Sequence, residues 1–414
     1  MEQIFKLTSH CQYVTGKNGS CLYNLLTGDI YSLSPEYINA LEVYDQTTKS
    51  FKLLDKYRHI YRDLQMKDMG VILDRNVSIS PINEFSSQMY DNALGAKNKI
   101  AVLYIEINNK CNLDCIFCNG EQPNIRSTAC KRFKTEEDTG NYFDYEALLL
   151  QAIELGVKDV ILIGGEPLLK LAYIQSIAQI CASNNLNLTI FTNGSIPIPL
   201  NVIKILNLCN TKLIVQVIAC NNEDYERITT KPSVWDKIIQ NINMWQNNGL
   251  DCIGQLLVGN FNETQLSNIA NELTQINLPF IAKYIMKYPI NEYSVTDPDI
   301  VMNPKYKLTR LDLFNYSESL KHQRCIANML AVSCDGKYMP CPSFRISLGK
   351  VKGIPMNKVL KSEKYIGLKK MCKDAIEGCK HCKYRYGCID CRAVEYSATG
   401  RLNGMKNCEI LNEL

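Results

Sequence analysis

Cysteine is unevenly distributed along this chain, and its distribution limits what the chain can fold into. Nine of the 19 cysteines lie in the 84 residues from Cys325 to Cys408, whereas the preceding 324 residues contain ten. The N-terminus has no positively charged region followed by an apolar stretch, so no signal peptide is predicted and a cytoplasmic location is expected. Because cytosolic thiols are kept reduced, the clustered cysteines are predicted to be metal ligands rather than disulfides.

The composition is that of a folded protein with two or three domains. Hydrophobic residues make up 46 % and charged residues 21 % of the 414 positions, enough for a sizeable core. The sequence has no run of eighteen apolar residues, so no membrane span is predicted. The formal net charge of +4 is too small a bias to indicate a nucleic-acid partner.

The first 95 residues are predicted to form a small α+β domain that is similar to a winged helix. Gly28 marks a hairpin turn, and Pro35 is typical of the first turn of a helix. Two hairpin strands, two helices and a last strand are expected in turn at 21–26, 29–33, 35–43, 51–69 and 71–73. Nine basic and eleven acidic residues give this domain a charge of 9 − 11 = −2, which disfavours DNA binding.

Residues 96–290 are predicted to form a partial (β/α)6 barrel. Helical patterns separate six apolar runs, at 101–107, 159–163, 187–192, 213–218, 252–258 and 280–285. Near-continuous apolar strands that alternate with helices indicate a parallel sheet covered by helices. A linker is expected at 291–320 and a cysteine-rich domain at 321–414. In parallel barrels the active site lies at the carboxyl ends of the strands.

Three cysteines follow the first predicted barrel strand with the spacing Cys-x3-Cys-x2-Cys. They are Cys111, Cys115 and Cys118. Three thiolates from one short loop can hold a cuboidal 4Fe-4S cluster and leave its fourth iron open. Zinc is the alternative metal, but structural zinc normally takes four ligands, and no fourth Cys or His lies within ten residues.

This cysteine triple, with Phe117 between its last two members, resembles the radical S-adenosylmethionine (SAM) enzymes. In that family SAM chelates the open iron, and the aromatic residue lies near the adenine. The sequence Gly-Gly-Glu-Pro resembles the family's GGEP element, and Thr-Asn-Gly ends the third strand as in many relatives. Many relatives have an arginine that contacts SAM, and the sequence leaves open whether Arg227 or Lys231 takes its place here. The resemblance implies that SAM is bound by Phe117, Gly164, Gly165, Glu166, Pro167, Asn193 and Gln216.

The C-terminal segment resembles the SPASM extension of some radical SAM enzymes, which holds two auxiliary 4Fe-4S clusters. The resemblance assigns Cys325, Cys341 and Cys391 to the first auxiliary cluster, and Cys379, Cys382, Cys388 and Cys408 to the second. Two residues rather than three separate Cys388 from Cys391. For the missing fourth ligand of the first cluster, Cys334 ranks ahead of an open iron and of Cys372. A pair of zinc ribbons is the alternative for this region.

The family resemblance implies three 4Fe-4S clusters, a flavodoxin- or ferredoxin-type electron donor and reductive cleavage of SAM to a 5′-deoxyadenosyl radical. The winged-helix-like domain resembles the element with which peptide-maturing relatives bind a leader peptide. We therefore expect oxidative crosslinking of a ribosomally made precursor peptide through a thioether, C–C or C–O bond. The run 379–392 is similar to maturases encoded with an ATP-grasp partner. Alternatives are a formylglycine-forming sulfatase maturase and a zinc-ribbon winged-helix regulator.

Overall fold

The computed structural model describes residues 3–45, 50–74, 99–118, 144–285, 292–296 and 308–408. Its largest element is a nine-stranded sheet that contains six consecutive parallel strands. In chain order these are β8 (Val102–Asn108), β9 (Asp159–Gly164), β10 (Asn187–Thr192), β11 (Lys212–Val217), β12 (Asp251–Val258) and β13 (Phe280–Tyr284). Each of the six apolar runs therefore forms a strand, and the predicted open parallel barrel is confirmed.

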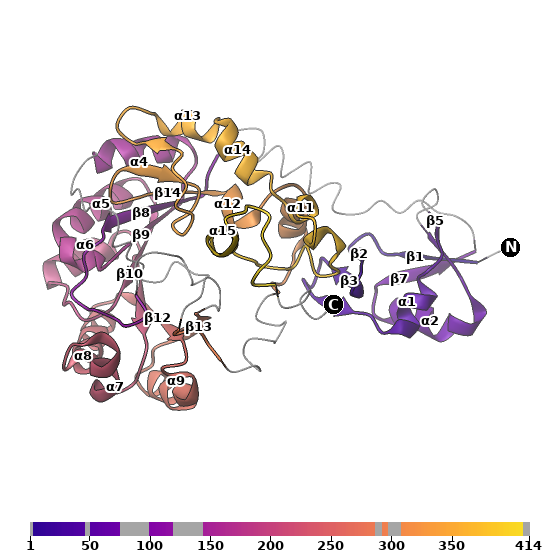
Figure 1. The fold of residues 1–414 in the computed structure, drawn as a ribbon, viewed down its shortest axis with the longest axis horizontal. Coiled ribbons are helices and arrows are strands. Elements are labelled where there is room, and N and C mark those ends of the chain that lie inside the picture. The colour runs from indigo at the N-terminus through magenta and orange to yellow at the C-terminus, as the bar shows by residue number, and fades with distance from the viewer. Residues whose placement is uncertain are drawn as a thin grey trace.

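Helices follow the parallel strands and cover one face of the sheet (Figure 1). They are α4 (Tyr145–Glu154), α5 (Leu171–Ser183), α6 (Leu200–Asn207), α7 (Asn222–Thr229), α8 (Val234–Asn247) and α9 (Leu266–Gln275). Fully buried side chains such as Leu162 and Ile177 fill the layer between helices and strands. Ile163 and Ala331 belong to a smaller apolar group on the opposite face of the sheet. The rigid strands place their connecting loops at one rim of the barrel.

The sheet continues into the cysteine-rich region, where the sequence did not predict strands. β14 (Met329–Val332) pairs in parallel with β8, and β15 (Lys337–Met339) and β16 (Gly349–Lys350) extend the sheet in antiparallel fashion. The helices here are α11 (Leu313–Lys321), α12 (Arg324–Ala327), α13 (Met356–Leu360), α14 (Glu363–Lys369) and α15 (Arg392–Thr399). α11 lies mostly within the segment expected to be a linker, and the carboxylate of Asp312 caps its first turn.

The N-terminal segment contains two sheets. The predicted hairpin is present as β3 (Gly19–Asn24) and β4 (Ile30–Ser32), and β2 (Cys11–Gly16) pairs with the other edge of β3. A second sheet has the order β5 (Tyr44–Asp45), β6 (Ser50–Lys52), β1 (Ile4–Leu7) and β7 (Gly70–Leu73). α1 (Pro35–Ala40) and α2 (Arg58–Met66) accompany these sheets. α2 is shorter than predicted because Phe51 lies in β6, where its ring meets Phe5 at 6.5 Å.

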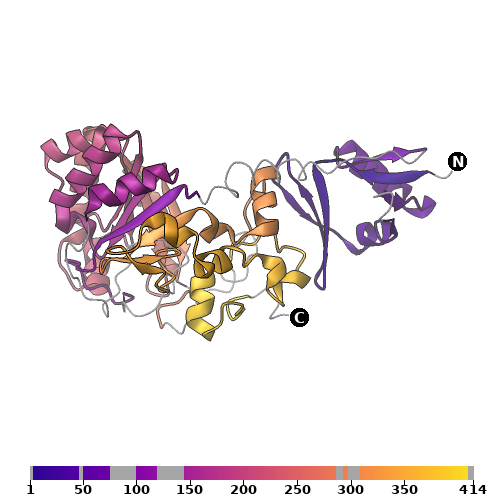
Figure 2. The ribbon, with the colours of Figure 1, turned by 90° about the horizontal axis from the view of Figure 1, so that it is seen from above.

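The three-stranded sheet attaches the N-terminal segment to the cysteine-rich region. Tyr23 on β3 is fully buried, with its ring 5.9 Å from that of Tyr316 and 6.3 Å from that of Tyr386. Figures 1 and 2 show the N-terminal sheets at one end of an elongated molecule, with the C-terminal segments between them and the barrel. In the described ranges no helix is long and apolar enough to cross a membrane.

Candidate active site

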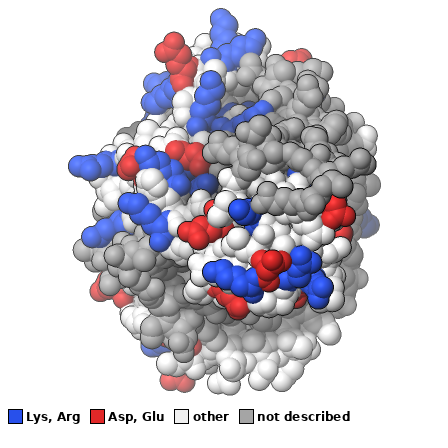
Figure 3. Space-filling view, turned by 90° about the vertical axis from the view of Figure 1, so that its right-hand side faces the viewer, with Lys and Arg blue, Asp and Glu red and all other residues white. Residues whose placement is uncertain are grey.

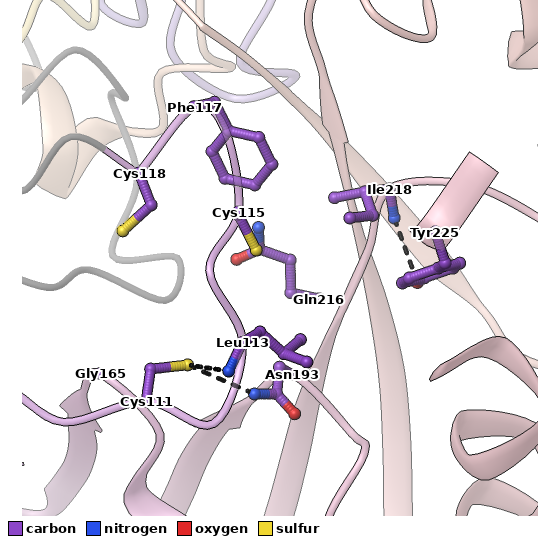
Figure 4. A pocket seen from close by; sticks show the side chains of 10 residues that line it. All are labelled: Cys111, Leu113, Cys115, Phe117, Cys118, Gly165, Asn193, Gln216, Ile218 and Tyr225. Carbon is purple, nitrogen blue, oxygen red and sulfur yellow. Dashed lines mark hydrogen bonds between the residues drawn. The ribbon is translucent and has the colours of Figure 1, made fainter. Parts of the chain in front are cut away.

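A pocket lies at the end of β8, where the cysteine triple turns over the barrel rim (Figure 4). Seven of the residues predicted from the sequence line it: Cys111, Cys115, Cys118, Phe117, Gly165, Asn193 and Gln216. Its other lining residues, which were not predicted from the sequence, are Leu113, Ile218 and Tyr225. The predicted residues Gly164, Glu166 and Pro167 do not line this pocket. Strands β8 to β11 thus bring most of the predicted SAM-binding residues to one place.

Backbone hydrogen bonds hold the cysteine loop against the end of α7. The Asp114 N–H donates to the carbonyl of Thr229 at 3.2 Å, and the Ile116 N–H donates to the carbonyl of Ile228 at 2.9 Å. Lys231, just beyond α7, forms a half-exposed ion pair with Asp114 at 3.7 Å. The backbone of the cysteine loop is therefore held in place by α7, which lies more than a hundred residues later in the sequence.

The two glycines of the Gly-Gly-Glu-Pro sequence allow close approach between the ends of β8 and β9. The Gly165 N–H donates to the carbonyl of Asn108 at 3.0 Å, and the Glu166 N–H donates to that of Lys110 at 2.8 Å. A Cβ atom on Gly164 would lie 2.2 Å from the Asn108 oxygen, and one on Gly165 would lie 2.2 Å from the Lys110 oxygen. Glycine is therefore required at both positions, and the contact sets the position of Cys111 one residue further on.

The carboxylate of Glu166 is completely buried and connects β9 to the end of β10. Its Oε1 accepts from the Leu168 N–H at 2.9 Å and from the Thr192 hydroxyl at 2.8 Å, while Oε2 accepts from the Asn193 N–H at 2.7 Å. Burial raises the pKa of Glu166 to about 7, and the three donors act in the opposite direction by favouring the ionised form. In this structure the side chain of Glu166 positions Asn193.

Asn193 is the centre of a polar network on the pocket wall. Its amide nitrogen donates to Asn112 Oδ1 at 2.9 Å and to the Cys111 sulfur at 3.6 Å (Figure 4 draws the contact to the sulfur). Its amide oxygen accepts from both the backbone and the hydroxyl of Ser195, and Ser195 Oγ also accepts from Asn112. Asn112 and Ser195 were not predicted from the sequence. Both are short polar residues close to predicted site residues, Asn112 directly after Cys111 and Ser195 two positions after Asn193.

Gln216 and Phe117 give the pocket a polar and an aromatic wall. Gln216 is 8 % exposed, and its amide oxygen has no hydrogen-bond partner within the described chain. The ring of Phe117 stacks on that of Phe261 at 5.2 Å with 17° between the planes. Arg227 donates to the Phe261 carbonyl at 3.3 Å and pairs with Asp224. A buried amide oxygen without a partner and a flat aromatic face are suited to a ligand that carries both polar groups and an aromatic ring, as SAM does.

The cysteines of the C-terminal region form two neighbouring groups. Burial, and the nearby Cys341 and Cys391, raise the pKa of the Cys325 thiol to about 12. Burial also raises the pKa of the Cys379 thiol to about 11, where Cys388 and Cys408 act as neighbouring thiols. Cys382 in turn has Cys388 beside it. The two groups of cysteines therefore interleave along the chain, because Cys391 lies near Cys325 although it is only three positions from Cys388 in the sequence.

Two family comparisons match these two regions. Residues 105–273 match the radical SAM superfamily, and residues 324–383 match an iron-sulfur cluster-binding domain called SPASM. The chain therefore contains a radical SAM domain and a SPASM domain. Curated relatives of this radical SAM/SPASM protein include an uncharacterised protein of Methanocaldococcus jannaschii (22 % identical) and the GTP 3′,8-cyclase of Petrotoga mobilis (26 %). The matches cover 48 % and 47 % of this chain and 62 % and 58 % of those relatives, less than two thirds of their length.

Solved structures with the same fold extend over more of the radical SAM/SPASM protein. Streptococcus suis SuiB bound to the precursor peptide SuiA has a TM-score of 0.53 at 13 % identity, covering 98 % of this chain and all of SuiB. The protein anSMEcpe with bound SAM has a TM-score of 0.56 at 15 % identity, covering 76 % of this chain and 95 % of its own. The family matches indicate that the chain carries iron-sulfur clusters and uses SAM.

Buried charges accompany the cysteines of the SPASM domain. The ammonium of Lys373 lies beside Cys388 and Cys379 of one group and Cys325 of the other, and it pairs with Asp390. Arg392 pairs with the same carboxylate and donates to the Gly404 carbonyl at 2.7 Å. Burial lowers the pKa of Lys373, whereas the neighbouring thiolates raise it. Cationic groups among thiolates offset the negative charge that a bound cluster would bring.

The candidates for the missing fourth ligand lie at different places. Cys334 is buried, and its backbone N–H donates to the Glu106 carboxylate of β8 at 3.2 Å. Cys372 directly precedes Lys373 and caps the short 3-10 helix η6 (Lys373–Ala375). The assignment of Cys334 as the fourth ligand of the first auxiliary cluster therefore stays a prediction. Cys130 falls outside the described residues.

Gly165→Ala is expected to lower the affinity of the radical SAM/SPASM protein for SAM by more than tenfold. The added methyl group must displace the Lys110 carbonyl, and with it the segment that carries Cys111. The affinity is measured by equilibrium binding of SAM to the reconstituted protein. Gly367→Ala is the matched control, because nothing lies within 4 Å of its added Cβ in α14. Equal affinity of the two variants would contradict this role of Gly165.

Proposed function

We propose that this radical SAM enzyme is a peptide maturase that oxidatively crosslinks side chains of a ribosomally made precursor. The N-terminal segment carries this proposal. The fold likeness to SuiB, solved with a precursor peptide, extends over 98 % of the chain, whereas the likeness to anSMEcpe covers 76 %. The two sheets of the N-terminal segment provide a surface that can bind a second part of a long substrate.

The proposed SAM-cluster ligands are Cys111, Cys115 and Cys118. Phe117, Gly165, Asn193 and Gln216 are proposed to bind SAM, and Glu166 to hold Asn193 in place. When bound, this cluster and SAM supply a 5′-deoxyadenosyl radical that removes a hydrogen atom from the substrate. The chain's own apolar pocket wall, including Leu113, Ile218 and Tyr225, excludes water from that site.

The auxiliary clusters are proposed to make the net reaction an oxidation by taking up an electron from the substrate. The first is proposed to be held by Cys325, Cys341, Cys391 and Cys334, and the second by Cys379, Cys382, Cys388 and Cys408. The neighbours of the described cysteines support this division, because Cys325 has Cys341 and Cys391 nearby, whereas Cys379 has Cys388 and Cys408 nearby. A flavodoxin- or ferredoxin-type protein is proposed as the electron donor, and an ATP-grasp enzyme as a partner in the same pathway.

The leader of the precursor is proposed to bind beside β2. This strand is an edge strand, since it pairs with β3 alone among the described strands. A cavity of about 520 Å³ lies next to it, with Tyr13, Leu41 and Phe51 among its apolar walls and Gln12 and Glu42 among its polar ones. Up to Val14, before the contacts of Thr15 and Gly16 with the SPASM domain, this edge can offer backbone donors and acceptors to an added strand, and the adjacent cavity can accept the side chains of that strand.

The charge pattern of this end of the molecule fits a peptide better than DNA. The view onto the N-terminal end shows Lys and Arg side chains interspersed with Asp and Glu rather than gathered in one patch (Figure 3). Nucleic-acid binding needs several basic side chains on one face, because phosphate neutralisation supplies most of the affinity. A mixed surface is compatible with a short peptide that is recognised through its backbone.

Mass spectrometry of the candidate peptide tests this function. The peptide encoded beside the gene is incubated with the reconstituted enzyme, SAM and a reductant, and its mass is compared before and after turnover. Crosslinking removes two hydrogen atoms per bond, and tandem spectra then show an unfragmented segment. A peptide of unchanged mass, in a reaction that does produce 5′-deoxyadenosine, would contradict crosslinking. Formylglycine in place of a cysteine or serine would instead indicate sulfatase-type maturation.

A further inference from the structure

The tip of the β2–β3 hairpin lies against the cysteine loop of the SPASM domain. The Lys17 N–H donates to the His381 carbonyl at 2.7 Å, and Arg385 donates to the Thr15 carbonyl at 2.8 Å. In both ribbon views the hairpin lies beside the C-terminal segments (Figures 1 and 2). Two parts of the chain more than 360 residues apart therefore meet, through one backbone and one side-chain hydrogen bond, at the loop that contains Cys379 and Cys382.

Gly16 permits this contact. A Cβ atom at this position would lie 2.5 Å from the His381 carbonyl oxygen, 2.5 Å from the Lys383 nitrogen and 2.8 Å from the Cys382 carbonyl carbon. All three are backbone atoms, which cannot rotate away as a flexible side chain can. Any other residue at Gly16 would push the hairpin off the cysteine loop.

Because the hairpin lies so close to the cysteine loop, the side chain of Asn18 contacts the sulfur atom of Cys382. Its amide nitrogen donates to the Cys382 sulfur at 3.6 Å, and its amide oxygen accepts from the Lys383 N–H at 2.9 Å. The second bond fixes which end of the amide faces the sulfur, because only the oxygen can accept from a backbone N–H. The backbone N–H of Tyr384 also donates to this sulfur, at 3.4 Å. Cys382 is 6 % exposed, so water has little access to it.

We propose that Asn18 is a positioning residue of the second auxiliary cluster and that its N–H···S hydrogen bond raises the reduction potential of that cluster. This rests on the proposed function, in which Cys382 is one of the cluster's four ligands. Hydrogen bonds to cysteine sulfur withdraw electron density from the thiolate and stabilise the reduced, more negative cluster. The N-terminal sheets then complete a redox site in the SPASM domain, and β2 connects that site to the cavity proposed for the leader.

An EPR-monitored redox titration of the full-length reconstituted protein tests the proposal. Asn18→Leu removes the donor at similar volume, so the midpoint potential of the second auxiliary cluster is expected to fall at unchanged iron content. Asn18→Asp places an anion against the sulfur and is expected to lower the potential further. Gly16→Val retains Asn18 but displaces it, and is expected to shift the potential in the same direction as Asn18→Leu. Asn271→Leu, on the exposed side of α9, is the matched control and is expected to cause no shift.

Cys382→Ser distinguishes failure of this proposal from failure of the proposed function. It identifies which EPR signal belongs to the second auxiliary cluster, because that signal alone is expected to change. If Cys382→Ser alters no cluster signal, the proposed ligand set fails and the role of Asn18 falls with it. If the signal is identified and Asn18→Leu leaves its potential at the wild-type value, the ligand set stands and the role of Asn18 is overturned.

Discussion

Replacing Cys111, Cys115 and Cys118 together by alanine is expected to abolish reductive cleavage of SAM. The three thiolates are proposed to be the only protein ligands of the SAM-binding cluster, so the variant loses that cluster completely. The auxiliary cysteines lie in a separate region and keep their own clusters. Bound iron is therefore expected to fall from about 12 to about 8 per chain, with no 5′-deoxyadenosine formed in the presence of dithionite.

Cys181→Ala is the control for this experiment. Cys181 is completely buried in α5, and burial raises its pKa to about 12, as expected for a thiol that acts as a small hydrophobic side chain. Its replacement is expected to leave both iron content and SAM cleavage unchanged. If the triple variant retained SAM cleavage, or if Cys181→Ala lost as much iron as the triple variant, the assignment of the SAM-cluster ligands would be wrong.

Arg345→Leu is expected to destabilise the junction between the barrel and the SPASM domain by about 3–5 kcal/mol. Arg345 Nη2 donates to Glu106 Oε2 at 3.1 Å, and Glu106 is 3 % exposed. The same carboxylate accepts from the Cys334 N–H, so it connects β8 to the turn just after β14. Removing the guanidinium takes this cation away from a buried carboxylate. Faster amide hydrogen exchange in β8 and β14, measured by mass spectrometry, would report the loss.

Two further variants show whether burial causes this effect. Adding Glu106→Gln to Arg345→Leu also removes the buried carboxylate charge that Arg345 pairs with, so the double variant is expected to regain most of the lost protection. Arg310→Leu breaks an exposed ion pair with Asp29, at 3.4 Å, and is expected to cost less than about 1 kcal/mol. An effect of Arg345→Leu no larger than that of Arg310→Leu would contradict the structural role assigned to Glu106.

The sequence predicted the barrel well because its signals are local. The strands β8 to β12 are nearly continuous apolar runs because most of their side chains are buried on both faces, whereas Ile281 of the last strand, β13, is exposed. The cysteine triple and the two glycines of Gly-Gly-Glu-Pro are contiguous motifs, and the barrel brings them together because each follows a strand. Gln216 was also found in this way, at the carboxyl end of β11.

The features that the sequence did not predict depend on contacts between distant residues. β14 pairs with β8 although more than 220 positions separate the two strands in the sequence. The four residues of β14 have no pattern that indicates which strand they pair with. The partnership of Glu106 with Arg345 was missed for the same reason, although a single carboxylate within an apolar strand was a usable signal. Phe51 was assigned to a helix because periodicity alone could not separate β6 from the start of α2. The contact of Asn18 with Cys382 becomes visible only once the hairpin is docked.

The central claim is that Cys111, Cys115 and Cys118 hold a cluster with one iron open to SAM. The most direct measurement is the EPR spectrum of the dithionite-reduced protein, recorded with and without SAM. SAM is expected to change the spectrum of the wild-type protein and to leave that of the triple alanine variant unaltered. A wild-type spectrum that SAM does not change, in protein with its full iron content, would contradict the claim.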